Sequence, residues 1–370
     1  MKKILLAAAS CAAALAVFLI YITLDGGSQR QLNLWYAQDC IPAPVMEELA
    51  EEYGSRSGDD SCRIILRSFA SEAELAAAFE QERPDLLLCS YTRAASLGSR
   101  GLLDAVEAVE WELLPAIGEA LPFVGKSFFP LGSRSPILVY NQAALDTAGI
   151  SPDFGSFEDF LARAAEYSEE TGSPFISAQS LSPVLCACCG SLGYRLEGEP
   201  QLDCMDESFT SIYNSLASAA LVGSFLPPGE DRLELAAAGL LPCLILDSPG
   251  ASELPEGLSY APLPLPEGGR SIYLADILGF AVTGANSYAL PWVRDFARWL
   301  ESYLSPEKVM GMGLIPASAP GESAWDALPN PVLAETWQNS EALIYPPLGN
   351  FAENRRDMEE ALCRALDLLY

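Results

Sequence analysis

The stretch SPILVYNQAALDTAGISP, residues 135–152, joins a β-forming segment to a short alanine-rich one. Residues 137–140 are bulky and suited to a strand, and residues 142–148 are mostly good helix formers. Asn141 is a residue type that caps the first turn of a helix. Gly149 readily adopts the left-handed conformation that ends one. The stretch therefore predicts a strand followed by a short helix, the building unit of an α/β protein.

The segments before this stretch repeat the same unit. Apolar strand patterns alternate with helix patterns, and Ser71 with Glu74 forms a capping-box pattern at the second helix. The order β-α-β-α-β predicts a parallel sheet, whose ligands bind at the carboxyl ends of the strands. The predicted elements are strand 31–37, helix 42–53, strand 62–69, helix 71–80 and strand 84–89.

The segments after the stretch predict a second α/β region. Ser156 and Asp159 form a cap pattern at a clear helix, and Asn286 with Ser287 is expected to cap a later one. Residues 175–240 carry a weaker pattern interrupted by Gly and Pro. The predicted elements are helix 156–171, strand 240–246, a return segment 260–266, strand 272–283, a helix ending at 303, a short helix from 305 and a last helix 353–369.

Composition limits the possible functions. The chain has 370 residues, enough for two domains, and 50% of them are hydrophobic. Its net charge of −29 argues against a nucleic-acid partner, which needs clustered Lys and Arg. The chain has no histidine, which removes Ser-His-Asp and Cys-His catalysis and His-ligated zinc. No cofactor motif is present, so no cofactor is expected.

The N-terminus predicts export. Lys2 and Lys3 precede the uncharged, mainly apolar run 4–24, which is long enough to span a bilayer. Residues 1–27 are consistent with an uncleaved membrane anchor, a cleaved signal peptide or a lipoprotein signal with Cys11 as the lipidated residue. Each alternative places the rest of the chain at the periplasmic or extracellular face of the cytoplasmic membrane. Two of the three tether it there.

Nine cysteines follow the apolar run, and an odd number leaves at least one thiol unpaired within a single chain. Export permits disulfides. The group Cys186, Cys188, Cys189 and Cys204 has no standard zinc spacing. A local disulfide and buried thiols are the main alternatives, and a metal site is the third.

Several segments, in order, resemble extracellular solute-binding proteins of the maltose and glycerol-phosphate type, the capture subunits of ABC importers. The resemblance extends over about residues 31–320. The segments that carry it are LNLWYA (32–37), FASEAELAAAFEQERPDLLLCS (69–90), SRSPILVYNQAALDTAGI (133–150), SFEDFLARAAE (156–166), YAPLPLPEGG (260–269), NSYALPWVRDFARWL (286–300) and GLIPAS (313–318).

The resemblance implies a type II periplasmic-binding-protein-like fold. In this fold, two α/β lobes are joined by a hinge, with the ligand cleft between them. The strand at the start of residues 135–152 would then carry the chain from one lobe to the other. The alternative is one more strand–helix unit in an ordinary α/β sheet. The implied division assigns 28–134 and 259–312 to lobe 1, and 135–258 and 313–370 to lobe 2.

Sugar recognition needs aromatic faces together with carboxylates, amides and Arg for hydroxyl groups. Such side chains follow several predicted strands, and strand alternation lets only one of Trp35 and Tyr36 face the cleft. Asp276 precedes a segment that is often Gly-rich in the family, and this sequence lacks those glycines. The candidate ligand-binding residues are Trp35, Tyr36, Ser68, Phe69, Tyr91, Ser133, Arg134, Asp247, Ser248, Asp276, Tyr345 and Phe351.

The resemblance implies a monomeric, non-enzymatic receptor that delivers a small polar solute, in particular a sugar or oligosaccharide, to ABC permease subunits. An alternative is a solute-sensing module coupled to a membrane signalling partner, which an uncleaved anchor would suit. A carboxylate-based glycan enzyme is a further alternative, although the sequence shows no recognisable catalytic constellation. The identity of the solute is not specified by the sequence.

Overall fold

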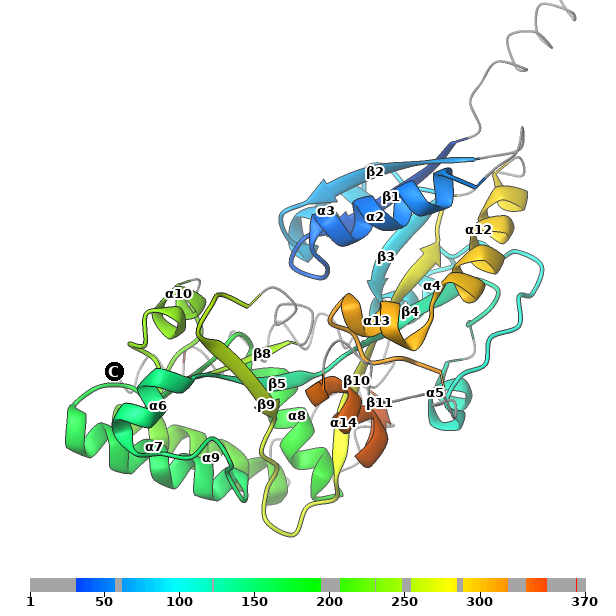
Figure 1. Cartoon of the computed structure of the whole chain (residues 1–370). Helices are drawn as coiled ribbons and strands as arrows, with labels where there is room; N and C mark the ends of the chain where they lie inside the picture. The colour runs from blue at the N-terminus through cyan, green and yellow to red at the C-terminus, as the bar shows by residue number, and fades with distance from the viewer. Residues whose placement is uncertain are drawn as a thin grey trace, which may run out of the picture.

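The computed structural model describes residues 31–56, 62–121, 123–193, 207–229, 231–247, 254–284, 289–318, 331–344 and 364. They form two α/β lobes, each built on its own sheet, at the upper right and lower left of Figure 1. One sheet has the strand order β11-β10-β3-β1-β2, with β4 also paired to β10, and the other has the order β7-β6-β8-β5-β9. The predicted α/β class and two-lobe architecture are confirmed.

The first sheet combines parallel and antiparallel pairs. β1 is parallel to β2 and β3, whereas β10 is antiparallel to β3 and β4. Every residue of β10 is buried, as expected for a strand covered on both faces. Its strands are β1 (Gln31–Ala37), β2 (Arg63–Phe69), β3 (Leu86–Ser90), β4 (Phe128–Arg134), β10 (Ile272–Val282) and β11 (Glu341–Ile344). The helices beside it are α2 (Ala43–Gly54), α3 (Glu72–Phe79), α4 (Tyr91–Ser99), α5 (Pro115–Ala120), α12 (Leu290–Tyr303), α13 (Pro306–Gly311) and α14 (Pro331–Asn339).

The second sheet is centred on β8 and β5, which are antiparallel. The weakly patterned region of the sequence supplies much of this half, including a helix, α8, whose residues are all buried. Its strands are β5 (Pro136–Asn141), β6 (Ile176–Ala178), β7 (Phe225–Leu226), β8 (Cys243–Asp247) and β9 (Leu258–Pro262). Its helices are α6 (Gln142–Ala148), α7 (Phe157–Thr171), α8 (Leu181–Ser191), α9 (Glu207–Leu221) and α10 (Arg232–Ala237).

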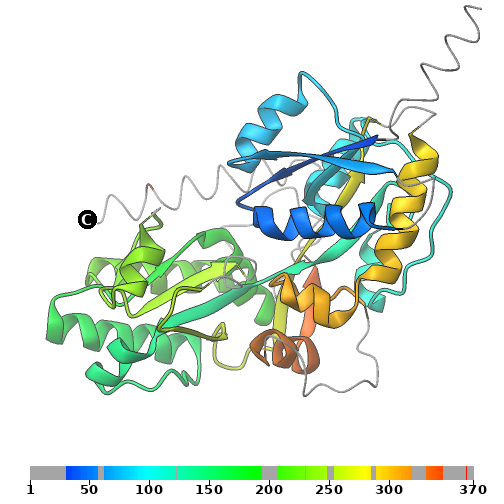
Figure 2. The same ribbon diagram turned by 45° about the horizontal axis from the view of Figure 1, so that its top comes forward.

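The strand–helix unit of residues 135–152 forms as the sequence predicts. The Asn141 side chain accepts a hydrogen bond from the Ala144 N–H (3.0 Å), which caps α6, and Gly149 ends the helix at φ 68°. Figure 2 shows the continuous segment β4–β5 running from one half of the molecule to the other. The strand of the opening stretch therefore leaves the first sheet and enters the second.

Two strands, β9 and β11, do not belong to the sheet that the predicted lobe ranges assign them to. β9 falls almost wholly in the range 259–312, predicted as lobe 1, but pairs with β5 in the second sheet. β11 falls in the range 313–370, predicted as lobe 2, but pairs with β10 in the first. β10 is long enough to pair with β3 through 278–282 and to offer 272–275 to β11. The lobe boundaries themselves stay a prediction.

Other expectations concern the chain ends and the cysteines. Residues 1–27 lie outside the described residues, as does the predicted last helix apart from Arg364. Within the described ranges, no helix is both long and apolar enough to cross a membrane. Cys188 is a buried free thiol, in agreement with the buried-thiol alternative at that position, and Cys40, Cys89 and Cys243 are buried free thiols as well. Cys204 lies outside the described residues.

Candidate functional site

A buried ion pair lies where the chain passes from the first sheet to the second. Arg134, the last residue of β4, is opposite Asp276 of β10 in the antiparallel ladder, and its Nη2 is 2.6 Å from Asp276 Oδ2. The two side chains are 7% and 9% exposed. Burial acts to lower the pKa of Arg134, but Asp276, and then Asp247 and Glu72, outweigh it and hold that pKa well above its usual value.

Two more acidic residues approach this pair from the first half. Asp39 follows β1, and its Oδ2 accepts a hydrogen bond from the N–H of Glu72 (3.1 Å), the first residue of α3. Cys40 is buried, and its thiol donates to Glu72 Oε1 (3.0 Å). The positive end of the α3 dipole favours the Glu72 carboxylate. Asp39, Cys40 and Glu72 therefore form one connected wall.

The pKa values of Asp39 and Cys40 in this wall are both raised, by burial and by nearby negative charge. Partial burial of the Asp39 carboxyl raises its pKa, and the charge of Glu72 raises it further, despite opposing effects of the Glu72 N–H and Arg134. Burial, and then the charge of Glu72, raise the pKa of Cys40 well above its usual value. The Cys40 thiol is therefore neutral at physiological pH and poorly suited to nucleophilic attack.

The second half contributes Asp247 and Gln179. Asp247 ends β8 opposite Pro136, two residues beyond Arg134 in the chain, and it is half-buried. Gln179 follows β6 and is exposed, and its Oε1 accepts a hydrogen bond from the Asp247 N–H (3.3 Å). Carboxylates from both halves, those of Asp276, Glu72 and Asp247, thus act on one guanidinium. We call Asp39, Glu72, Arg134, Asp247 and Asp276 the carboxylate–arginine cluster.

The aromatic candidates lie in the packed interior. Trp35 and Tyr36 belong to different hydrophobic clusters, as strand alternation requires, and both are buried. The Trp35 ring packs on Phe69 (5.2 Å between centroids), and the Arg67 guanidinium lies over it at 4.5 Å. Tyr91 is 2% exposed. All four aromatic side chains are buried in this arrangement, and their stacking on a ligand stays a prediction.

The remaining candidates have varied positions. Ser68 is exposed and interacts with the Tyr36 hydroxyl. Ser133 is fully buried, and its Oγ has no hydrogen-bond partner among the described residues. Ser248, Tyr345 and Phe351 lie outside the described residues. Of the twelve candidates, the structure brings Arg134, Asp247 and Asp276 into one cluster.

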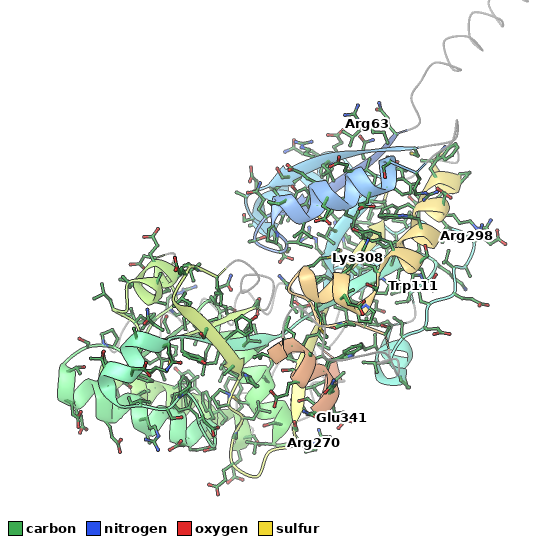
Figure 3. All side chains as sticks on the ribbon, viewed as in Figure 1. Arg63, Trp111, Arg270, Arg298, Lys308 and Glu341 are labelled. Carbon is green, nitrogen blue, oxygen red and sulfur yellow. The ribbon has the colours of Figure 1, made fainter. Side chains whose placement is uncertain are left out.

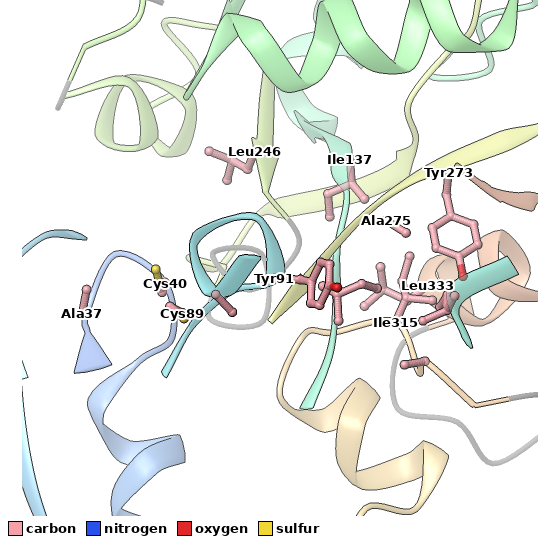
Figure 4. Packing of buried hydrophobic residues seen from close by; sticks show 14 of the residues in the cluster. Ala37, Cys40, Cys89, Tyr91, Ile137, Leu246, Tyr273, Ala275, Ile315 and Leu333 are labelled. Atoms are coloured by element: carbon pink, nitrogen blue, oxygen red, sulfur yellow. The ribbon is translucent and has the colours of Figure 1, made fainter. Parts of the chain in front are cut away.

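One hydrophobic cluster contains residues from both sheets. It includes Cys40, Cys89 and Tyr91 from the first half, and Ile137 and Leu246 from the second. Figure 4 shows some of its residues, with Cys40 and Cys89 on one side, Ile137 and Tyr91 in the middle, and Tyr273 and Leu333 on the other side. Cys40 belongs to this cluster and also donates to Glu72, so the apolar packing and the polar cluster meet at Cys40.

Sequence reasoning missed Asp39, Cys40, Glu72 and Gln179. Three of them follow the end of a strand in the sequence within a few residues, and Glu72 follows the Ser71 cap. The loops after strands were recognised as ligand positions, but aromatic residues inside the strands were preferred to polar residues just beyond them. Among the described residues, no group of acidic or cysteine side chains is arranged to hold a metal ion.

Solved structures give the comparison with known proteins. The GacH receptor of Streptomyces glaucescens, solved unliganded and with acarbose, matches with a TM-score of 0.75 and 15% identity over 92% of this chain and 94% of that one. The chain has the two-lobe fold of ABC substrate-binding proteins. Maltose-bound MalE3 of T. maritima matches with a TM-score of 0.69 and 13% identity, over 92% and 95% of the two chains.

A third solved structure has a similar fold. The ABC substrate-binding protein Lmo0181 from Listeria monocytogenes, in complex with cycloalternan, matches with a TM-score of 0.69 and 11% identity, covering 92% of this chain and 94% of that chain. No family model matches the sequence, and no curated protein matches it either. At these identities the structural likeness shows the fold.

Proposed function

We propose that this chain is an exported receptor that captures a sugar or oligosaccharide between its two lobes and delivers it to an ABC-type permease. The observation that carries the proposal is the two-lobe fold, shared over 92% of the chain with receptors whose structures hold acarbose, maltose or cycloalternan. In such a fold, ligand binding shifts the population toward the closed arrangement of the lobes.

The carboxylate–arginine cluster supports a polyhydroxylated ligand. Glu72 and Asp39 of the first half and Asp247 with Gln179 of the second can accept or donate hydrogen bonds from opposite sides of one solute. Asp276 and Arg134 form the buried part of this surface. Because each lobe supplies only part of the contacts, closure of the lobes is needed to complete them.

The wider assignment follows from the sequence and the fold together. The apolar run 4–24 would export the chain and, in two of its three alternatives, tether it at the outer face of the cytoplasmic membrane, near a permease. A monomer that binds without performing chemistry fits this role. No described residue provides an activated nucleophile in the cluster, where the Cys40 pKa is raised.

A thermal-shift series tests the proposal. The full chain, kept in detergent because of the apolar run, would be heated with malto-oligosaccharides, cello-oligosaccharides, polyols and amino acids. A ligand at a hundredfold excess over Kd stabilises by about 2.7 kcal/mol, which is several degrees even for a large protein. A sugar that shifts the Tm and compacts the chain in small-angle scattering supports the proposal. Amino acids acting in place of every sugar would contradict it.

A further inference from the structure

A cavity lies where the strands that connect the two halves separate. β4 pairs with β10 as far as Arg134 and Asp276. Beyond this point the chain continues from β4 into β5 of the second sheet, whereas the start of β10 stays beside β11 in the first. The cavity has a volume of about 100 Å³ and is lined by residues 135–137 on one strand and 271–274 on the other. We call it the fork cavity.

The other walls of the fork cavity come from both halves. The segment 262–265, at the end of β9, and Ala187 of α8 line it from the second half, and Thr336 of α14 lines it from the first. Ala187 carries only a methyl group, and Gly190 follows it by about one turn of α8. A Cβ at Gly190 would overlap the Leu343 side chain, so α8 lies close against β11. The cavity is therefore part of the junction between the halves.

Two buried hydroxyl groups of the fork cavity have no hydrogen-bond partner among the described residues. They are Tyr273 Oη and Thr336 Oγ1, and the Tyr273 side chain is 3% exposed. In Figure 4, the Tyr273 hydroxyl points toward Leu333, which precedes Thr336 by one turn of α14. Burial raises the pKa of Tyr273, so its hydroxyl is neutral at physiological pH. A molecule that forms hydrogen bonds with both hydroxyls would remove the cost of burying them unpaired.

The outer end of the fork cavity is polar, and its groups are already paired. Ser271 Oγ donates to the Asn339 carbonyl (3.1 Å) and lies 3.0 Å from Ser340 Oγ. Arg270 and Glu341, the next residues along the chain, are exposed and pair with each other (3.4 Å) near α14 (Figure 3). No charged side chain is among the described residues that line the cavity. Unused hydrogen-bonding capacity is therefore found on its neutral inner hydroxyls.

We infer that the fork cavity binds a small neutral molecule with two hydrogen-bonding groups, such as a short-chain diol. A cavity of about 150 Å³ holds benzene, so one of about 100 Å³ suits roughly four or five non-hydrogen atoms. An ion would lose its hydration without gaining a counter-charge. A purely apolar molecule would leave the hydroxyls of Tyr273 and Thr336 unpaired. Water alone would leave the apolar walls at Ile137, Leu263 and Leu265 without an apolar contact.

The fork cavity is separate from the site proposed for the sugar. In Figure 4, Tyr273 lies on the opposite side from Cys40, which donates to Glu72 in the carboxylate–arginine cluster. The Arg134–Asp276 pair is the last pairing of β4 with β10 before the fork. The inference therefore goes beyond the proposed function and does not depend on it.

A titration of the full chain in detergent, followed by saturation-transfer NMR of the probe, tests the inference. Propylene glycol, lactate and isopropanolamine share one carbon skeleton and are neutral, anionic and cationic at about pH 7. We expect saturable binding of propylene glycol with a Kd on the order of 10 mM, as suits so small a ligand. Both ions should bind at least about tenfold more weakly, a difference of about 1.4 kcal/mol. Xenon, followed by its chemical shift, is the apolar probe.

Variants of the lining residues assign the binding to the fork cavity. Tyr273→Phe and Thr336→Val each remove one hydroxyl and nearly keep the side-chain shape, and should weaken diol binding about threefold or more. Ala187→Val adds bulk at the cavity wall and should weaken it about tenfold. Tyr213→Phe removes the same hydroxyl from α9, outside the cavity, and should leave the Kd unchanged. Circular dichroism and the Tm check that each variant is folded.

Three results would overturn the inference. The first is no saturable binding of the diol, and the second is binding of xenon or of either ion as tight as that of the diol. The third is diol binding that is unchanged in Tyr273→Phe, Thr336→Val and Ala187→Val, which would place the diol elsewhere. A failure of sugars to shift the Tm would count against the proposed function alone, because these titrations contain no sugar.

Discussion

The carboxylates in the two parts of the carboxylate–arginine cluster have different kinds of partner. Between β4 and β10, the Asp276 carboxylate is matched by a guanidinium at 2.6 Å and both are buried. At the start of α3, Asp39 and Glu72 lie together and are matched mainly by backbone N–H and thiol donors. The first arrangement is complete in the empty protein. The second leaves the two carboxyl groups close together, and the pKa of Asp39 is raised there.

The largest predicted effect comes from breaking the complete pair. Asp276→Asn leaves the Arg134 guanidinium buried without its carboxylate, and we expect the free energy of unfolding to fall by about 3–5 kcal/mol. Urea denaturation measures it. The control is Glu80→Gln, which breaks the exposed pair with Arg100 (3.0 Å) and should cost about 1 kcal/mol or less. Equal losses in the two variants would show that burial does not distinguish these pairs.

The packing around the complete pair gives the second prediction. Gly132 lies two residues before Arg134, and a Cβ there would lie 2.9 Å from both Leu314 Cβ and Val309 Cγ1. Gly132→Ala should therefore lower the free energy of unfolding by about 1–3 kcal/mol, as overpacking does. The control is Gly155→Ala, where a Cβ would have no neighbour within 4 Å. A stable Gly132→Ala variant would mean that the segment at 309–315 yields easily.

The sequence predicted the local elements well because their signals are local. β1 has the predicted bounds, and the caps at Ser71, Asn141 and Ser156 are present with their expected hydrogen bonds. The predicted cap at Asn286 and Ser287 lies outside the described residues. The lobe ranges were harder to predict, because the partners of β9 and β11 are chosen by strand edges far away in the sequence. No periodicity in residues 341–344 indicates that they complete the first sheet.

The candidate site shows the same limit. Arg134 and Asp247 were found because they lie beside the ends of predicted strands, and Asp276 because the segment after it is often Gly-rich in the family that the sequence resembles. The contact between Arg134 and Asp276 depends on the antiparallel pairing of β4 with β10, which no local pattern shows. Trp35 and Phe69 were chosen for their chemistry, and the structure buries both. Asp39 and Glu72 meet only through the return of α3 to the loop after β1. Residue type alone does not show that contact.

The third prediction concerns the incomplete part. Because the folded-state pKa of Asp39 is raised, its contribution to stability is greatest below its unfolded pKa and is lost as the pH rises through the folded value. At neutral pH the ionised carboxylate is therefore unfavourable in the empty protein. Asp39→Asn keeps an oxygen that accepts from the Glu72 N–H, and should raise the free energy of unfolding by about 0.5 kcal/mol or less.

A pH series of the Tm checks this sign. The advantage of the Asp39→Asn variant over the original chain should be present at pH about 7 and disappear at pH about 3, where the carboxyl is protonated in both states. The Glu169→Gln variant, on an exposed helix face, controls for the general effect of removing one negative charge from an acidic protein. An advantage for Asp39→Asn that grows toward low pH would contradict the raised pKa.

The smallest expected change lies at Ser133, a polar residue in the complete part whose Oγ has no partner among the described residues. Removing a buried hydroxyl that makes no hydrogen bond costs little, so Ser133→Ala should change the free energy of unfolding by about 0.5 kcal/mol or less. Ser156→Ala is the contrast, because its Oγ accepts from the Asp159 N–H (3.1 Å) at the start of α7 and its loss should cost about 1 kcal/mol. Denaturation measures both variants, and sugar titration then separates two roles for Ser133. Unchanged stability with weaker sugar binding would mean that the Ser133 hydroxyl contacts the ligand. A loss of stability as large as that of Ser156→Ala would mean that the hydroxyl stabilises the fold where β4 pairs with β10.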